Sequence, residues 1–175
     1  MASTLAAGVA IVPMRWWHLE SVFHIEEDIF SDEPWTPSMF WSELAEYETR
    51  SYFVATAESA NSVPNRADDD IVGYAGLCVY PEEAFVQTIA VRRDWQRQGV
   101  GTLLLRTLIG QASSRGAPRL ELEVRADNYV AQHLYETHGF RRVGVRKGYY
   151  QHGRTDAVLM SLDLLRHHSG NERRP

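Results

Sequence analysis

The sequence predicts a mixed α/β domain in which helices pack around one central sheet. Two observations favour this class: stretches with the alternation or apolar character of strands recur along the chain, and stretches with helical spacing lie between them. The order is one strand, two helices, three strands, one helix, one strand, one helix and two strands. This interleaving is typical of helices packed on a single sheet.

The first half of the chain predicts two helices and three of these strands. The expected strands are 8–14, 50–58 and 70–80, and the expected helices are 15–30 and 37–48. The first helix is amphipathic, with Trp16, Leu19 and Val22 among its apolar residues at helical spacing. In the second helix, Thr36 is the expected N-cap and Pro37 occupies the first helical position. The segment before the third strand is a polar connector rich in turn formers.

The second half alternates strands and helices. The expected strands are 83–91, 118–124, 140–150 and 155–164, and the expected helices are 99–114 and 128–139. Strict alternation in the strand 118–124 places Glu123 on a polar face, opposite Leu122 and Val124.

Length and composition indicate one ordinary globular domain. The chain has 175 residues, of which 44% are hydrophobic and 23% charged. We expect the domain to span residues 8–165, with flexible termini at 1–7 and 166–175. The net charge of -5 argues against direct nucleic-acid binding, which depends on clustered Lys and Arg, and it leaves room for a basic partner.

The single cysteine and the apolar stretches bear on the compartment. Cys78 excludes an internal disulfide and fits a reducing environment, so we expect a cytoplasmic protein. No stretch approaches the ~20 apolar residues of a membrane span. Because Cys78 lies in an apolar strand without a nearby histidine, a buried structural thiol is favoured over a nucleophile. The histidines show no metal-ligand spacing, and we predict no metal.

A loop with two glycines, 96–101, connects the strand 83–91 to the helix that follows. A helix N-terminus exposes unpaired N–H groups and a partial positive charge, so the arrangement predicts an anion site. A tight turn without a ligand would have a similar sequence. The lysine of a Walker loop is missing, and position 104 is Leu where a dinucleotide fingerprint needs glycine. Three basic residues lie close enough in sequence to add charge: Arg92, Arg93 and Arg97.

With Q-x-x-G-x-G directly after an apolar strand, the run TIAVRRDWQRQGVGTLLL resembles the acetyl-coenzyme A (acetyl-CoA) site of the GNAT (GCN5-related N-acetyltransferase) family. The segments LELEVRADNYVAQHLYETHGF and KGYYQHGRTDAVLMSL resemble the RimI type, bacterial enzymes that acetylate the N-terminal alanine of ribosomal protein S18. The resemblance covers roughly residues 9–163. It implies a mostly antiparallel sheet of about seven strands with about four helices, splayed at the acetyl-CoA site.

The resemblance also implies a set of cofactor contacts. Backbone contacts with the pantetheine arm would come from Ile89, Ala90 and Val91. The pyrophosphate would lie against Gln96, Arg97, Gln98, Gly99, Val100, Gly101 and Thr102. Asn128 corresponds to an asparagine that contacts the cofactor in these enzymes, and its position before a helix also predicts an N-cap.

Acetyl transfer to an amine poses two proton problems. A protein α-amine has a pKa of ~7.7–8.0 and is largely protonated at neutral pH, so a base must remove its proton, and the departing thiolate benefits from an acid. In the RimI type the base is the Glu of L-E-V-R, which is Glu123 here, and the acid is the Tyr of L-Y-x-x-x-G-F, which is Tyr135 here. Spacing alone would favour a solvated carboxylate and a core aromatic at these positions.

The resemblance implies the acceptor as well. We expect direct transfer, in a ternary complex, to the N-terminal amine of ribosomal protein S18. Other protein N-termini, a lysine or a small amine are the alternatives, and a non-catalytic acyl-CoA-binding module is the rival of another class. Tyr149 and Tyr150 correspond to paired tyrosines beside the acceptor. An acidic cluster, by default a solvated face, is hypothesised to attract a basic peptide: Glu26, Glu27, Asp28, Asp32 and Glu33.

Overall fold

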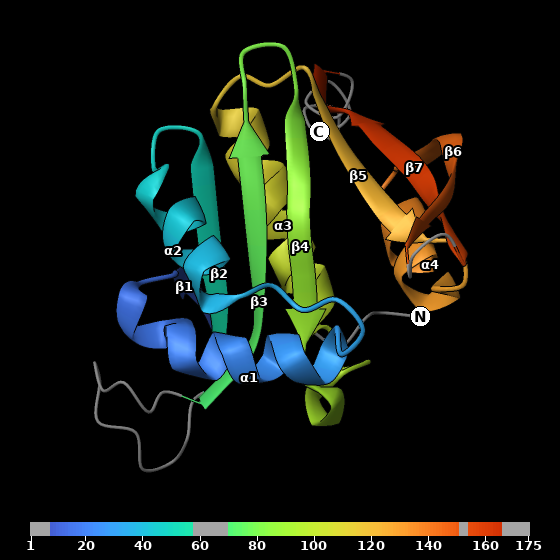
Figure 1. The fold of residues 1–175 in the computed structure, drawn as a ribbon. Coiled ribbons are helices and arrows are strands. Elements are labelled where there is room, and N and C mark those ends of the chain that lie inside the picture. The colour runs from blue at the N-terminus through green and yellow to red at the C-terminus, as the bar shows by residue number, and fades with distance from the viewer. Residues whose placement is uncertain (1–7, 58–69, 151–153, 166–175) are drawn as a thin grey trace. The chain divides into compact units, whose positions relative to one another are not determined.

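The computed structural model describes residues 8–57, 70–150 and 154–165 (Figure 1). Both predicted flexible termini and residues 58–69 of the predicted connector lie outside the described part. The elements follow the predicted order: β1 (Val9–Pro13), α1 (Leu19–Ile29), α2 (Pro37–Ala45), β2 (Arg50–Ala57), β3 (Asp70–Val79), β4 (Ala84–Val91), α3 (Val100–Ser114), β5 (Arg119–Arg125), α4 (Tyr129–Thr137), β6 (Arg141–Tyr150) and β7 (Thr155–Asp163).

The described residues form two compact units. The first contains the chain up to Leu77 together with Gln87–Leu108, and the second contains Cys78–Val86 together with the chain from Ile109. Strand β4 therefore contributes its first residues to the second unit and the rest to the first. That residues 8–165 act as a single domain stays a prediction.

The strands are hydrogen-bonded in the order β1-β2-β3-β4-β5-β7-β6. Strand β1 runs antiparallel to β2, and β7 runs antiparallel to both β5 and β6. Strand β4 pairs with β5 in parallel, in a register of two residue pairs, Ala84 with Leu120 and Phe85 with Glu121. The predicted mixed α/β class, with one open and mostly antiparallel sheet, is confirmed.

Two helices begin at the predicted capping residues. The Thr36 hydroxyl accepts a hydrogen bond from Met39 N–H at 3.4 Å, with Pro37 at the first position of α2. Asn128 caps α4 by accepting from Ala131 N–H at 3.1 Å. Both caps were predicted from sequence because capping depends on residues that lie within one turn of each other.

The start of the first predicted helix differs from the expectation. Residues Trp16–His18 form a 3-10 turn, η1, and α1 begins only at Leu19. The His18 ring, which is buried, accepts a hydrogen bond from Arg15 N–H at 3.0 Å and so holds the tighter turn. Trp16 is 62% exposed, so its predicted place on the buried face of an amphipathic helix is wrong.

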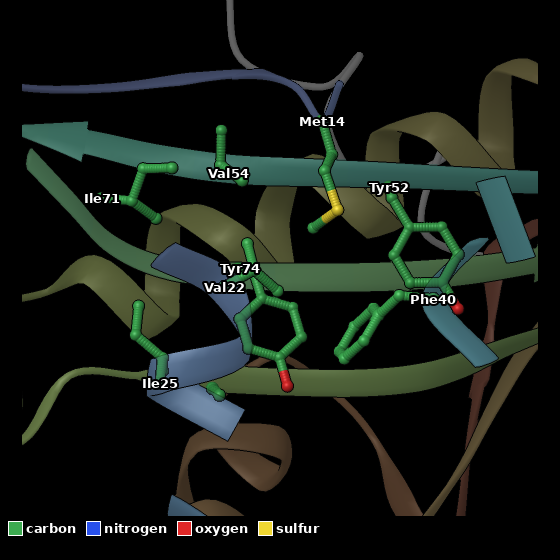
Figure 2. Close-up of a cluster of buried hydrophobic side chains, with 9 residues drawn as sticks. Met14, Val22, Ile25, Phe40, Tyr52, Val54, Ile71 and Tyr74 are labelled. Atoms are coloured by element: carbon green, nitrogen blue, oxygen red, sulfur yellow. The ribbon is translucent and has the colours of Figure 1, made fainter. Parts of the chain in front are cut away.

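The core of the first unit lies on one face of its strands, beneath α1 and α2. Its buried side chains are Met14, Val22, Ile25, Phe40, Tyr52, Val54, Ile71, Tyr74 and Ala90 (Figure 2). Neighbouring residues of β3 point to opposite faces. Tyr74 lies with its ring centroid 5.8 Å from that of Phe40, whereas a side chain at Gly73 would meet Val100 and Leu104 of α3. Figure 1 accordingly shows α1 and α2 in front of these strands and α3 behind them.

A glycine in β3 allows a close approach of the Tyr52 ring. A Cβ atom added at Gly76 would lie 2.2 Å from that ring, closer than packed atoms come. The Tyr52 hydroxyl donates to Glu43 Oε2 at 2.7 Å, and Arg50 Nε donates to the same oxygen at 2.8 Å. Strand β2 is thus joined to α2 by apolar packing and by a shared carboxylate.

The core of the second unit follows the alternation predicted for β5. Leu120, Leu122 and Val124 are buried, and the residues between them are partly exposed. Strand β7 adds Val158, Met160 and Leu162 to the buried side. Burial of these aliphatic side chains is the main stabilising contribution expected for a unit of this kind.

A buried carboxylate joins three parts of the first unit. Glu26 is only 2% exposed, and its Oε1 accepts from Trp35 N–H at 2.8 Å while its Oε2 accepts from the Tyr74 hydroxyl. The interpretation of Glu26 as part of a surface acidic cluster is therefore wrong: the residue lies inside, where burial raises its pKa despite these two hydrogen bonds. It fixes the segment after α1 to β3.

Replacing Glu26 with Gln is expected to remove a pH dependence of the free energy of unfolding. Because burial raises the pKa of Glu26, the folded chain binds this proton more tightly than the unfolded chain. That stabilisation is complete below the unfolded pKa of ~4.3 and is lost as the pH rises through the higher folded pKa. Urea titrations between about pH 4 and pH 8 should show the wild type losing stability relative to Glu26→Gln with rising pH.

The matched control is Glu27→Gln, which removes a carboxylate from the exposed neighbouring position. Its stability relative to the wild type should change far less over the same pH range. If the difference in the free energy of unfolding between the wild type and Glu26→Gln stays constant with pH, the raised pKa assigned to Glu26 is contradicted.

Candidate functional site

The glycine loop has the backbone shape of an anion site in the first unit. After β4 the chain makes a 3-10 turn, η2 (Arg93–Trp95), and enters α3 at Val100. Arg97 has φ 60° and Gly99 has φ 89°, both in the left-handed region, so the chain turns sharply before the helix. Leu103 N–H donates to the Gly99 carbonyl at 3.0 Å, the first bond of the helix. The preceding N–H groups thus lie at a helix N-terminus, which suits a pyrophosphate.

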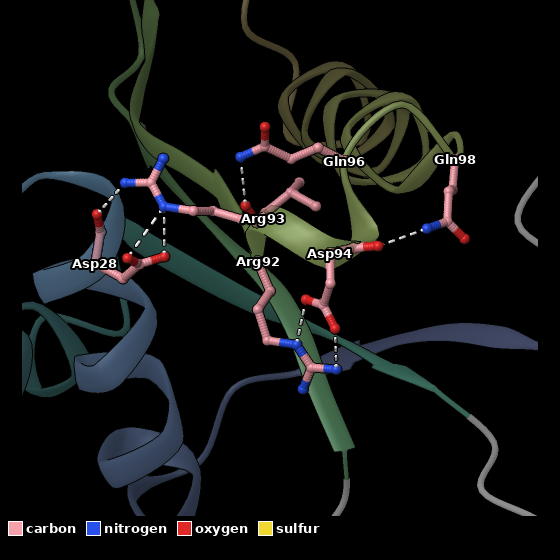
Figure 3. Close-up of polar contacts among 7 residues, drawn as sticks. Asp28, Arg92, Arg93, Asp94, Gln96 and Gln98 are labelled. Atoms are coloured by element: carbon pink, nitrogen blue, oxygen red, sulfur yellow. Dashed lines mark hydrogen bonds and ion pairs between the residues drawn. The ribbon is translucent and has the colours of Figure 1, made fainter.

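The two glutamines of this loop hold its shape (Figure 3). Gln96 Nε2 donates to the Val91 carbonyl at 3.0 Å, and Gln98 Nε2 donates to the Asp94 carbonyl at 2.7 Å. Each side chain closes a ring with the backbone a few residues upstream. Their amide nitrogens therefore stabilise the loop, and the backbone N–H groups beyond them are the donors suited to a phosphate.

The arginines before the loop are held by carboxylates (Figure 3). Arg92 donates to both carboxylate oxygens of Asp94, at 2.8 and 3.0 Å, and this lowers the pKa of Asp94. Arg93 Nε lies 2.9 Å from Asp28 Oδ2, and its Nη2 donates to the Asp28 carbonyl at 2.7 Å. Both arginines thus have carboxylate partners, and the charge that they would add to the loop stays a prediction. Arg93 also joins the end of α1 to η2.

The other predicted cofactor residues of the first unit occupy β4 and the start of α3. Ala90 is buried in the core, and Ile89 and Val91 on either side of it are partly exposed. Val100 is fully buried and anchors the first turn of α3. Their contacts with acetyl-CoA, like those of Gly101 and Thr102, stay predictions.

In the second unit, Glu123 lies on the partly exposed face of β5, as the alternation predicted. Its side chain is 28% exposed, and its Oε1 lies 2.7 Å from Arg146 Nη1 of β6. The Tyr149 hydroxyl is hydrogen-bonded to the same carboxylate, which raises the pKa of Tyr149. Arg146 Cζ lies 4.9 Å from the centroid of the Tyr149 ring. Glu123 thus has a cationic and a neutral partner on β6.

Arg146 was missed by sequence reasoning. Its contact with Glu123 depends on the register of three strands, because Glu123 pairs with Leu159 of β7, and Leu159 pairs with Gly144 of β6. Arg146 lies two residues further along β6 and therefore on the same face as Gly144. The positive charge at position 146 was the only local signal, and many exposed arginines share it.

Tyr135 is buried inside the second unit. It is 8% exposed, and its ring centroid lies 5.8 Å from that of Phe140. Burial, with a smaller contribution from nearby Tyr150, raises the pKa of Tyr135. The hydroxyl therefore keeps its proton at neutral pH. This environment agrees with the core-aromatic interpretation, and the role of Tyr135 as the proton donor stays a prediction.

Tyr150 and Asn128 complete the predicted residues of the second unit. Burial, followed by the charge of Glu123, raises the pKa of Tyr150 to about 12. The ring centroids of Tyr149 and Tyr150 are 5.0 Å apart. Asn128 is exposed and caps α4, which confirms one of its two predicted roles; its contact with the cofactor stays a prediction.

The described residues also bear on Cys78, on metal ligands and on membrane-spanning helices. Cys78 is 1% exposed, which agrees with a buried structural thiol and disfavours an acetyl-cysteine route. Within the described part of the chain, no group of three or more His, Cys, Asp or Glu side chains is placed to hold a metal ion. Of the helices that the structure describes, none has the length and apolar character needed to cross a membrane.

Comparison with known proteins identifies the family. The Acetyltransferase (GNAT) family matches residues 19–140 of this chain. A [ribosomal protein bS18]-alanine N-acetyltransferase from Escherichia coli is 34% identical over 148 residues, covering 83% of this chain and 91% of the relative. The N-alpha-acetyltransferase RimI of Mycobacterium tuberculosis is 38% identical over 144 residues, covering 79% and 82%.

A solved structure has the same fold. The crystal structure of the ribosomal-protein-S18-alanine N-acetyltransferase from Escherichia coli superposes with a TM-score of 0.75 at 33% identity, over 89% of this chain and 94% of that chain. The chain belongs to the GNAT family of acetyltransferases. It is an acetyl-CoA-dependent N-acetyltransferase, which confirms the activity that the loop and the L-E-V-R motif implied.

Replacing Gly99 with Ala is expected to weaken acetyl-CoA binding. At φ 89° an L side chain is strained by about 1–2 kcal/mol, so the loop would relax away from the shape that suits a pyrophosphate. We expect the Kd for acetyl-CoA to rise about tenfold, measured by isothermal titration calorimetry. The matched control is Gly110→Ala in α3, where an added Cβ meets nothing within 4 Å, so the Kd should not change. Equal affinities in both variants would contradict this role for the loop.

Proposed function

We propose that this chain acetylates the N-terminal α-amine of ribosomal protein S18 in the cytoplasm. The observation that carries the proposal is its similarity to enzymes named for that acceptor, at 34% identity over 91% of the Escherichia coli relative. The exposed carboxylates Asp32 and Glu33 add support, because they would attract a basic N-terminal segment.

The first unit has the binding role in this proposal. Residues Gln96–Thr102 would hold the pyrophosphate of acetyl-CoA through backbone N–H groups at the start of α3. The backbone of Ile89, Ala90 and Val91 would contact the pantetheine arm, and Asn128 of the second unit would add a polar contact. The thioester of acetyl-CoA supplies the activated acetyl group.

The second unit has the proton-transfer role. Most of an α-amine is protonated at neutral pH, so Glu123 removes a proton from it, directly or through a water molecule. The amine nitrogen then forms a bond with the acetyl carbon, the bond from that carbon to sulfur breaks, and the nitrogen releases its second proton to water to give the amide. Tyr135, a phenol that carries its proton at neutral pH, gives that proton to the departing thiolate. No acetyl-enzyme intermediate is needed, which agrees with the burial of Cys78.

A panel of acceptors tests the proposed function. Peptides that differ in their first residues, including the S18 N-terminus, a lysine peptide with a blocked N-terminus and small amines, are incubated with acetyl-CoA. Mass spectrometry then locates the acetyl group. We expect acetylation of the α-amine of the S18 peptide. Preferred acetylation of a lysine or a small amine would contradict the proposed acceptor, and acetyl-CoA binding without any transfer would indicate a binding module.

Replacing Glu123 with Gln is expected to lower kcat by ~10²–10⁴-fold, because the amide cannot accept the amine proton. The Kd for acetyl-CoA should stay unchanged, since the predicted pyrophosphate contacts lie on the loop of the first unit. Glu121→Gln is the matched control: Glu121 lies on the same strand and face, with a side chain 32% exposed. Equal turnover in the wild type and Glu123→Gln would remove Glu123 from the mechanism.

Reversing the charge at Asp32 and Glu33 is expected to raise the KM for a basic acceptor peptide several-fold at low salt and to leave kcat unchanged. The difference from the wild type should shrink at high salt, because exposed charges are screened. The control reverses Glu46 and Glu48, two exposed acidic residues after α2, and changes the net charge equally. An unchanged KM at low salt would show that this acidic pair does not attract the acceptor.

A further inference from the structure

Arg146 reaches the proposed base from two strands away within the second unit. Glu123 of β5, Leu159 of β7 and Gly144 of β6 form one cross-strand row and share a face of these strands. Gly144 has no side chain, so this row has a side chain on β5 and on β7 but none on β6. Arg146 is the next residue of β6 on that face, and its guanidinium extends back to lie 2.7 Å from Glu123 Oε1.

Three side chains form a closed group around this contact. Arg146 binds Glu123, Tyr149 donates a hydrogen bond to Glu123, and the Arg146 guanidinium lies 4.9 Å from the centroid of the Tyr149 ring. Each member therefore contacts the other two. Contact with an aromatic ring restrains a planar guanidinium, and two donors restrain the direction of a carboxylate. The group holds the direction in which the Glu123 carboxylate points.

This group contributes little to folding. The side chain of Arg146 is 52% exposed and that of Glu123 is 28% exposed, and ion pairs this exposed add little to the stability of a protein. Fixing the orientation of a catalytic base affects the reaction rate more than the stability, because proton transfer depends on the distance and angle between the reacting groups. The geometry is better explained by function at Glu123 than by structural support.

We propose that Arg146 is a positioning residue for acetyl transfer, which holds the Glu123 carboxylate in the orientation that receives the acceptor proton. The inference rests on the proposed role of Glu123 as the base. Arginine suits this task better than lysine, because the guanidinium keeps its proton and binds a carboxylate with a defined geometry, whereas an ammonium is a point charge on a flexible stem. The residue acts through Glu123 and forms no bond with the substrate.

The test compares Arg146→Ala and Arg146→Lys with the wild type and Glu123→Gln, with whichever acceptor the panel identifies. Arg146→Ala should lower kcat by about tenfold or more, with an unchanged Kd for acetyl-CoA and an unchanged Tm. Arg146→Lys should recover part of the loss. The matched control is Lys147→Ala, which removes another exposed cation of β6, paired with Asp156 at 2.8 Å, and should keep kcat within about twofold.

Chemical rescue separates positioning from a structural effect. Guanidinium ion at about 20 mM should restore part of the turnover of Arg146→Ala by occupying the vacated space beside Glu123, and it should not restore Glu123→Gln. Arg146→Ala with wild-type or higher kcat would overturn the proposal, and so would a loss that guanidinium leaves unchanged. Full turnover in Glu123→Gln would instead refute the proposed base and this inference with it.

Discussion

The buried carboxylate of Glu26 is the constraint on which the first unit depends. A carboxylate removed from water is unfavourable unless its oxygens accept hydrogen bonds, so α1, the segment at Trp35 and the Tyr74 hydroxyl must stay together. Tyr74, whose hydroxyl donates to Glu26, packs its ring against that of Phe40 in the core of this unit. Asp32 and Glu33 of the acidic cluster therefore lie on the segment between α1 and α2, and the end of this segment at Trp35 is fixed to β3 through Glu26.

In the glycine loop, as at Glu26, polar groups are held by hydrogen bonds within the protein. Two of its polar side chains, Gln96 and Gln98, donate to backbone carbonyls, and Arg93 of the preceding turn η2 donates to the end of α1. The groups best placed for a phosphate are then the N–H groups of α3's first turn, whose direction the left-handed backbone at Gly99 sets. Recognition by backbone explains why the spacing of glycines identifies such a loop more reliably than its charged residues do.

The sequence predicted the structural features that depend on residues close together along the chain. The caps at Thr36 and Asn128, the order of elements and the polar face of β5 follow from local spacing, and all were confirmed. The burial of Glu26, the exposure of Trp16 and the contact of Arg146 with Glu123 depend on which strands and helices meet, and residue type alone pointed the wrong way or gave no signal. The family resemblance supplied the activity, because neither the spacing of Glu123 nor that of Tyr135 distinguishes a catalytic group from an ordinary one.

Glu26 and Glu123 show how one residue type serves two purposes. Glu26 is enclosed, and its neutral partners, a backbone N–H and a phenol, compensate burial only in part, so its pKa is raised. Its hydrogen bonds to Trp35 and Tyr74 give it a structural role. Glu123 lies on a partly exposed face, with the Arg146 guanidinium 2.7 Å from its carboxylate. A base must be reachable by its substrate, and a partly exposed site meets this requirement where burial does not. Arg146 lies two strands away, and it reaches Glu123 because the register of β5, β7 and β6 places both residues on one face.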